Sequence, residues 1–160
     1  MLIGVIVAAY IIIPKIIRAL YNKGEQIVLK DTHDKSEELL QTVVNFKTKA
    51  PLEEIHNMLS KHVVGHDEPH AGMAIEVKNQ NRIVYALGGW YSFKSELSFA
   101  EAEGTTTASY RILEHVDDGG VSKCFKEMMA NRNEVISAFK EADPNVEIST
   151  SSQQLYKSKK

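Results

Sequence analysis

The sequence predicts an α+β domain in which a curved antiparallel sheet packs against one long C-terminal helix, preceded by an N-terminal transmembrane helix. Three patterns support this prediction: an uncharged apolar run at the N-terminus, a series of alternating segments separated by short turns, and an apolar stripe at helical spacing near the C-terminus. Strands joined by short turns pair antiparallel and usually carry one apolar face. A single amphipathic helix can cover that face.

Length and composition indicate one globular domain and exclude some kinds of partner and site. The 160 residues are 43% hydrophobic and 25% charged, as expected for one globular domain with an appended segment. The 19 basic and 21 acidic side chains give a net charge of -2, so nucleic acid is not an expected partner. Cys124 is the only cysteine, which excludes an internal disulfide and a multi-cysteine zinc site.

The N-terminal segment predicts a membrane anchor. Residues 1–14 carry no charged side chain, and the apolar character continues to residue 21. About 20 apolar residues suffice to cross a bilayer. The positive side chains Lys15, Arg18 and Lys23 all follow the run, which places the N-terminus outside and the remaining chain in the cytoplasm. The alternative is a buried or interfacial helix kinked at Pro14.

Composition also divides the rest of the chain. Residues 22–40 lack sustained periodicity and are interpreted as a linker, and residues 41–148 as the domain. Residues 149–160 are rich in serine, glutamine and lysine, which predicts a disordered tail.

The domain begins with a strand and a helix. Residues 42–48 alternate, with Val44 and Phe46 on one face, as in a half-buried strand. Pro51 then begins a helix with two glutamates in its first turn. Leu52, Ile55 and Leu59 follow at helical spacing, and Gly65 ends the pattern.

Four strands and a long helix complete the domain. Alternating segments at residues 73–77, 82–88, 91–102 and 105–116 are separated by turn signals, which predicts an antiparallel meander. From Val121 to Phe139 apolar residues recur at steps of three and four, which predicts a helix that ends before Asp143 and Pro144.

This order of elements resembles the START-like superfamily, also called polyketide cyclase-like or helix-grip domains. The resemblance rests on VVNFKTKAPLEEIHNML, a strand followed by a helix, and on ELSFAEAEGTTTASYRI, a later hairpin, and covers residues 41–142. The chain shows four meander strands and one covering helix where the superfamily usually has six and two. The resemblance implies a cavity between sheet and helix that holds an apolar ligand.

Candidate binding residues follow from this arrangement. Aromatic side chains on the predicted strands and a methionine and an arginine on the predicted helix would line the cavity: Tyr85, Tyr91, Phe93, Tyr110, Met128 and Arg132. The alternative is that the aromatic residues are ordinary core and that Arg132 reaches water from the edge of the apolar stripe.

A histidine-rich segment is the other concentration of polar chemistry. His62, His66 and His70 lie close in sequence, with two acidic residues between them. Gly65 and Pro69 interrupt any continuous helix there, so a polar loop is favoured over a metal site. We predict no catalytic residue, no metal ligand and no cofactor.

These observations favour a noncatalytic, membrane-anchored domain that binds a lipid or another small apolar ligand between its sheet and its long helix. Two alternatives remain: a membrane-tethered protein-interaction or structural module without a ligand, and a small hydrolase or cyclase that uses the segment from His62 to His70. The sequence does not identify protein partners.

Overall fold

The computed structural model describes residues 34–63, 73–88, 92–118, 121–122 and 124–153. The chain divides into two units, Met1–Lys35 and Ser36–Lys160, and the second holds the domain. The predicted anchor at residues 1–21 lies outside the described residues. Within the described part of the chain, no helix is long and apolar enough to cross a membrane.

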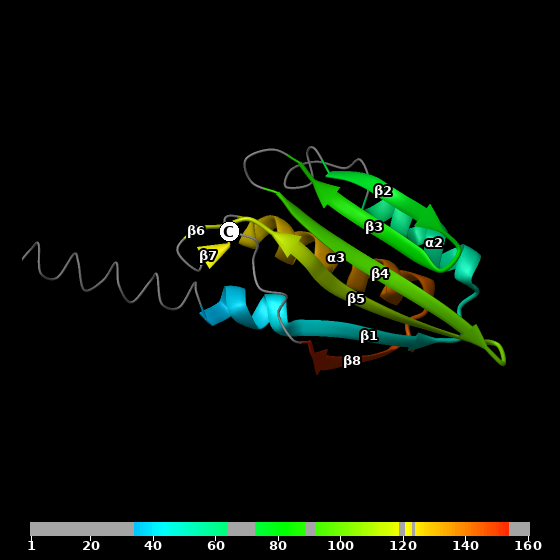
Figure 1. The fold of residues 1–160 in the computed structure, drawn as a ribbon. Coiled ribbons are helices and arrows are strands. Elements are labelled where there is room, and N and C mark those ends of the chain that lie inside the picture. Colours follow the sequence, from blue (N-terminus) through cyan, green and yellow to red (C-terminus); the bar gives the residue numbers. More distant parts are fainter. Residues whose placement is uncertain (1–33, 64–72, 89–91, 119–120, 123, 154–160) are drawn as a thin grey trace, which may run out of the picture. The chain divides into compact units, whose positions relative to one another are not determined.

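The centre of the domain is a six-stranded sheet in which every neighbouring pair is antiparallel (Figure 1). The order across the sheet is β2-β3-β4-β5-β1-β8, so the first strand lies between the fifth and the last. The strands are β1 (Thr42–Thr48), β2 (Met73–Asn79), β3 (Arg82–Leu87), β4 (Phe93–Ala102), β5 (Thr105–His115) and β8 (Glu147–Ser152).

Two helices, α2 (Leu52–His62) and α3 (Phe125–Ala142), lie together on one face of this sheet (Figure 1). Their buried side chains, among them Ile55 and Leu59 of α2 and Val135 and Phe139 of α3, share one core with the inner side chains of the strands. The predicted fold class, α+β with an antiparallel sheet against a C-terminal helix, is therefore confirmed. The predicted single covering helix is wrong, because α2 packs beside α3.

The first strand and helix form where the sequence predicts. In β1, Val44, Phe46 and Thr48 are buried while Lys47 is exposed. In α2, Pro51 is the N-cap residue, two glutamates lie in the first turn, and Lys61 and His62 lie in the last. The charges of the two glutamates and of Lys61 are opposite in sign to the partial charges at their ends of the helix.

The four meander strands are also confirmed. β4 and β5 are joined by a two-residue turn at Glu103 and Gly104, where both residues have positive φ, at 50° and 71°. Positive φ at both central residues is typical of type I′ hairpin turns, and glycine adopts it without strain.

The predicted linker and tail both need correction. Residues 34–41 are helical, and Ser36, Leu39 and Leu40 are buried, so the domain begins before residue 41. The first four residues of the predicted disordered tail, 149–152, belong to β8, which pairs with β1 from Thr42 opposite Ser152 to Lys47 opposite Glu147. Backbone hydrogen bonds hold this strand although its side chains are exposed and carry no apolar pattern.

The start of α3 differs from the prediction. The helix begins at Phe125 rather than Val121, because Val121–Ser122 (β7) pairs with Asp117–Asp118 (β6) in a small two-stranded sheet. Backbone pairing across this short hairpin takes the place of the first helical turn that the apolar spacing predicted.

Candidate functional site

A buried polar group lies between the sheet and α3. The hydroxyls of Ser95 on β4 and Tyr110 on β5 each donate a hydrogen bond of 2.7 Å to Oδ1 of Asn131 on α3. The three residues are at most 1% exposed. Alternation along the strands turns Ser95 and Tyr110 inward, and helical spacing places Asn131 on the face of α3 that meets them.

The amide nitrogen of Asn131 has no strong acceptor among the described residues. The Asn131 side-chain amide has two N–H bonds, and among the described residues it contacts only the Met73 thioether, with Nδ2 3.3 Å from Sδ. Thioether sulfur is a weak acceptor. The neighbouring Arg132 has a buried Nε without a hydrogen-bond partner in the described part of the chain. The interior therefore offers N–H donors for which the described residues supply no strong acceptor.

The hydroxyl of Tyr110 within this group and that of Tyr85 nearby both stay protonated. Burial raises the pKa of Tyr85, and the nearby Tyr110 raises it further. Burial also raises the pKa of Tyr110, although the hydrogen bond with Ser95 and the charge of Arg132 act in the opposite direction. Both side chains are therefore neutral hydrogen-bonding groups at physiological pH.

The structure brings most of the predicted binding residues into this interior. Tyr85, Phe93, Tyr110 and Met128 are each 1% exposed or less. Arg132 is only partly buried, and Tyr91 lies outside the described residues. Their role in binding stays a prediction, since the same burial is what ordinary core residues show.

Two central residues, Ser95 and Asn131, were missed by the sequence prediction, which followed apolar side chains only. Ser95 continues the inward series of Phe93 and Leu97 at a period of two. Asn131 lies three residues after Met128 and four before Val135. Polar residues at apolar positions of a periodic pattern were the signal that could have identified them.

The histidine segment is described only at His62. Its Nε2 lies 2.6 Å from Oε2 of Glu141, and its Nδ1 lies 3.4 Å from Oε2 of Glu134, so it links α2 to α3. Hydrogen bonds from Lys61 and His62 lower the pKa of Glu141. His66 and His70 lie outside the described residues, and no cluster of metal-binding side chains occurs in the part that the structure describes.

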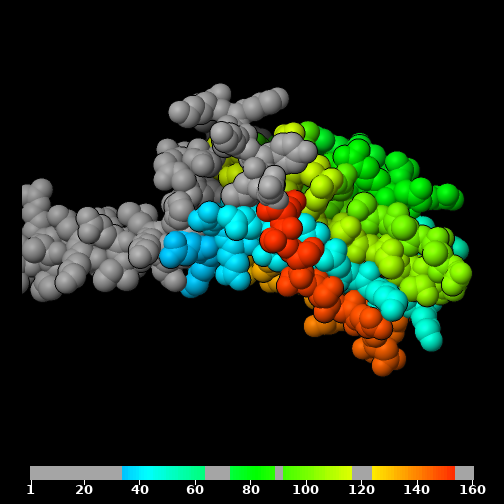
Figure 2. Space-filling model, turned by 60° about the horizontal axis from the view of Figure 1, so that its bottom comes forward, coloured from blue at the N-terminus to red at the C-terminus, as the bar shows by residue number. Residues whose placement is uncertain are grey.

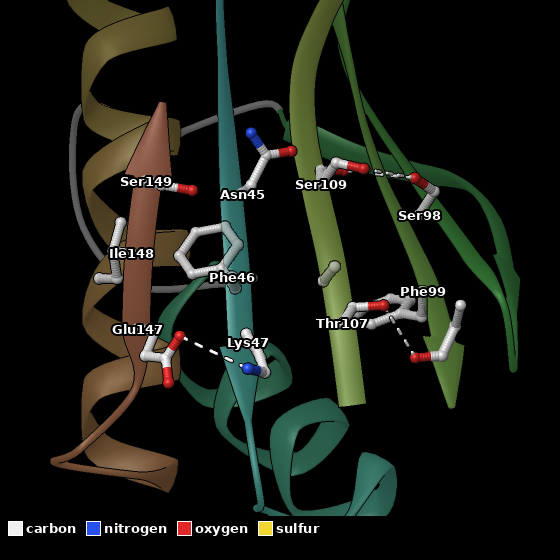
Figure 3. A pocket seen from close by; sticks show the side chains of 12 residues that line it. Asn45, Phe46, Lys47, Ser98, Phe99, Thr107, Ser109, Glu147, Ile148 and Ser149 are labelled. Carbon is white, nitrogen blue, oxygen red and sulfur yellow. Dashed lines mark hydrogen bonds and ion pairs between the residues drawn. The ribbon is translucent and has the colours of Figure 1, made fainter. Parts of the chain in front are cut away.

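The outer face of the sheet carries a separate hollow of about 590 Å³ across β8, β1, β5 and β4 (Figure 3). Its polar side chains mostly bond to one another or to the backbone. The Ser98 and Ser109 hydroxyls are 3.2 Å apart, and Thr107 donates to the Ala100 carbonyl at 3.2 Å. Most polar side chains of this hollow are therefore already paired within the described part of the chain.

A second hollow, of about 800 Å³, lies between the start of α2 and the turn from β2 to β3. It includes His56, whose ring lies 5.0 Å from that of Phe99. Burial lowers the pKa of His56 and the charge of Lys78 lowers it further, against the opposing effect of the Gln80 carbonyl. A neutral imidazole on an aromatic ring is a packing arrangement, and no nucleophile is seen beside it among the described residues that line the hollow.

The outer face also holds a shielded carboxylate, Glu96, which is 5% exposed. Arg111 donates to its Oε2 through Nε at 2.8 Å and Nη2 at 2.5 Å, and Arg82 donates to its Oε1. Burial alone would raise the pKa of Glu96, but the hydrogen bonds and charges of Arg111 and Arg82 outweigh it and lower that pKa.

The lowered pKa of Glu96 predicts a pH-dependent contribution to stability. A carboxyl with a lower pKa in the folded state stabilises it above the unfolded pKa, about 4.3 for glutamate, and this contribution is lost as pH falls through the folded pKa. Because both arginines are half exposed, we expect a contribution of about 1 kcal/mol.

Urea unfolding between pH 6 and pH 3 measures this contribution. The free energy of unfolding of the wild type should fall more steeply than that of Glu96→Gln, because only the wild type loses this carboxylate contribution as pH falls. Glu76→Gln, which removes the exposed pair with Lys94, is the matched control and should follow the wild type. Equal slopes for wild type and Glu96→Gln would refute the assignment.

The chain has detectable similarity to solved structures. No family model matches the chain, and no curated protein matches it. The crystal structure of the di-domain ARO/CYC BexL from the BE-7585A biosynthetic pathway is 14% identical, with a TM-score of 0.36. The match covers 81% of this chain and 59% of that chain. The strand order of the sheet and the two helices on one of its faces define the fold without this match.

Proposed function

We propose that this domain binds a small, largely apolar molecule between its sheet and α3, and that a hydrogen-bond acceptor on this molecule faces Asn131 and Arg132. The observation that carries the proposal is a pair of buried donors without a strong acceptor: the Asn131 amide has only a thioether, and Arg132 Nε has no partner among the described residues. A carbonyl or carboxylate oxygen would satisfy both groups.

The surroundings suit a mostly apolar ligand. Phe93, Met128 and the tyrosine rings supply apolar surface, and Ser95 and Tyr110 hold the Asn131 carbonyl so that its amide group has a fixed direction. Methionine side chains adapt their shape readily, so Met73 and Met128 could move to admit a ligand into an interior that is otherwise closely packed.

A second candidate function is a binding module without a ligand. The burial of Tyr85, Phe93, Tyr110 and Met128 to 1% exposure or less favours it, because these side chains then fill the space that a ligand would need. The two candidates differ in one observable property. Only the first predicts that the N–H groups of Asn131 and Arg132 bind an apolar molecule that carries a hydrogen-bond acceptor.

Titration of the full chain with decanoate and with decanol distinguishes them. We expect decanoate to shift the NMR signals of the Asn131 side-chain amide and of Arg132 Nε–H, and to bind about tenfold more tightly than decanol because its acceptor is charged. Arg132→Met should remove this preference. Lys140→Met, which removes an exposed cation from the same helix, should keep it. Unmoved signals at saturating decanoate would favour the module without a ligand.

The proposal retains residues 1–21 as a membrane anchor, on the length and charge pattern of the sequence alone. Alkaline extraction of membranes should leave the full chain in the pellet and release a chain that lacks these residues. Release of the full chain would overturn the anchor and leave the binding proposal untouched. The hydrolase or cyclase alternative has no support among the described residues, where His62 bonds to two carboxylates.

A further inference from the structure

The strand β8 forms one edge of the sheet, and no described residue pairs with its outer side. All six of its residues are exposed. In Figure 2 the strand, coloured orange-red, lies at the front of the molecule, and no other described segment lies over it. A free edge presents a row of N–H and C=O groups that can pair with another strand.

The β1–β8 ladder shows which backbone groups face outward. Gln153 donates its backbone N–H to the Gln41 carbonyl at 2.8 Å, one step beyond the pair of Thr42 and Ser152. Hydrogen-bonded positions alternate along an antiparallel ladder. The backbone groups of odd-numbered residues in β8 therefore face β1, and those of Ile148, Thr150 and Ser152 face the free edge.

The two edges of the sheet differ in how well they are protected against pairing with a further strand. The opposite edge strand, β2, has an irregularity between Ile75 and Val77 and carries charges at Glu76 and Lys78. Such features prevent edge-to-edge pairing. Residues 148–152 of β8 contain no charge and no proline, and Ile148 is a large hydrophobic residue exposed to 37%.

We propose that β8 pairs with β8 of a second copy of this chain, antiparallel about a two-fold axis, with Thr150 opposite Thr150. In this register Ile148 lies opposite Ser152, so all three outward-facing residues of each copy form hydrogen bonds. Glu147 lies opposite Gln153, and no like charges meet. The helices of both copies lie on the same side of one continuous sheet.

Neighbouring registers use fewer of these groups. If the axis passed through Ser149, Ser152 would face Val146, whose N–H already donates to the Asp143 carbonyl at 3.0 Å. Centring on Ser151 would leave Ile148 opposite residue 154, beyond the strand. The register centred on Thr150 is therefore the one that pairs the whole strand.

Two charge variants at the axis test the proposal. In sedimentation velocity of the full chain in mild detergent, we expect the wild type to dimerise with increasing concentration. Thr150→Lys and Thr150→Glu alone should each weaken the dimer about tenfold or more, because like charges then meet across the axis. A mixture of the two variants should restore it. Thr107→Lys, at an exposed position on β5 away from the edge, should behave like the wild type.

A proline variant distinguishes a loss of dimerisation from a loss of folding. Thr150→Pro removes an N–H that faces the free edge, so it should abolish dimerisation while the circular dichroism spectrum stays that of the wild type. Ser151→Pro removes an N–H that faces β1 and should loosen β8 itself. A wild type that remains monomeric at all concentrations, or a dimer insensitive to Thr150→Lys and Thr150→Pro, would overturn the proposal.

Discussion

Phe139→Ala is expected to lower the free energy of unfolding by about 3–5 kcal/mol, the range found for large aromatic side chains removed from a core. Phe139 is fully buried, and its ring stacks on that of Phe46 with centroids 4.0 Å apart and planes at 12°. The Phe99 ring lies 6.4 Å away. The ring thus joins α3 to β1 and β4, and alanine leaves a cavity that none of these elements can close alone.

Urea denaturation followed by circular dichroism measures this effect. Phe125→Ala is the matched control, since it removes the same side chain from the same helix at a position that is only partly buried. It should cost clearly less than Phe139→Ala. Equal losses for the two variants would mean that the aromatic stack is not the centre of the core.

Asn131→Ala is expected to lower the free energy of unfolding by about 2–4 kcal/mol. The substitution removes the acceptor of two hydrogen bonds and leaves the Ser95 and Tyr110 hydroxyls buried with only each other as partners. Each buried donor left without an acceptor costs about 1–3 kcal/mol. Asn133→Ala, at an exposed position on the same helix, should change stability by less than about 0.5 kcal/mol.

A double-mutant cycle separates the hydrogen bond from general packing. Tyr110→Phe alone removes a donor, and in the Asn131→Ala background it also removes an unsatisfied hydroxyl. The combined loss should therefore be smaller than the sum of the single losses. Strict additivity would show that the 2.7 Å contact between Tyr110 and Asn131 does not stabilise the fold.

Much of the architecture follows from periodicity. The alternation of Val44 and Phe46 identifies β1, and Pro51 with its two following glutamates identifies the start of α2. These signals are local, so they can be recognised without knowledge of the neighbouring elements. The short turn at Glu103 and Gly104 is equally local.

The remaining features depend on contacts between distant segments. The strand β8 has a sequence of small polar residues that resembles a disordered tail, and its place is set by pairing with β1, about a hundred residues earlier. Likewise Val121 fits the apolar stripe of α3 but pairs with Asp118 instead. Neither partner can be read from the segment itself.

The candidate site was predictable in its apolar part only. Tyr85, Phe93, Tyr110 and Met128 were found because large apolar residues mark the inner face. Asn131 and Ser95 were not, because the choice between a buried polar residue and an exposed one depends on which side chains meet across the layers. Arg132 was predicted to face either the ligand or water; its Nε is buried without a partner among the described residues, and its role stays a prediction.

Native mass spectrometry of the full chain, released gently from detergent with and without added decanoate, tests most directly whether the interior binds a small molecule. With decanoate we predict a stoichiometric adduct that is absent after denaturation, about tenfold weaker in Arg132→Met and unchanged in Lys140→Met. A native mass equal to the denatured mass under both conditions would contradict the proposed function and leave a domain whose interior serves the fold alone.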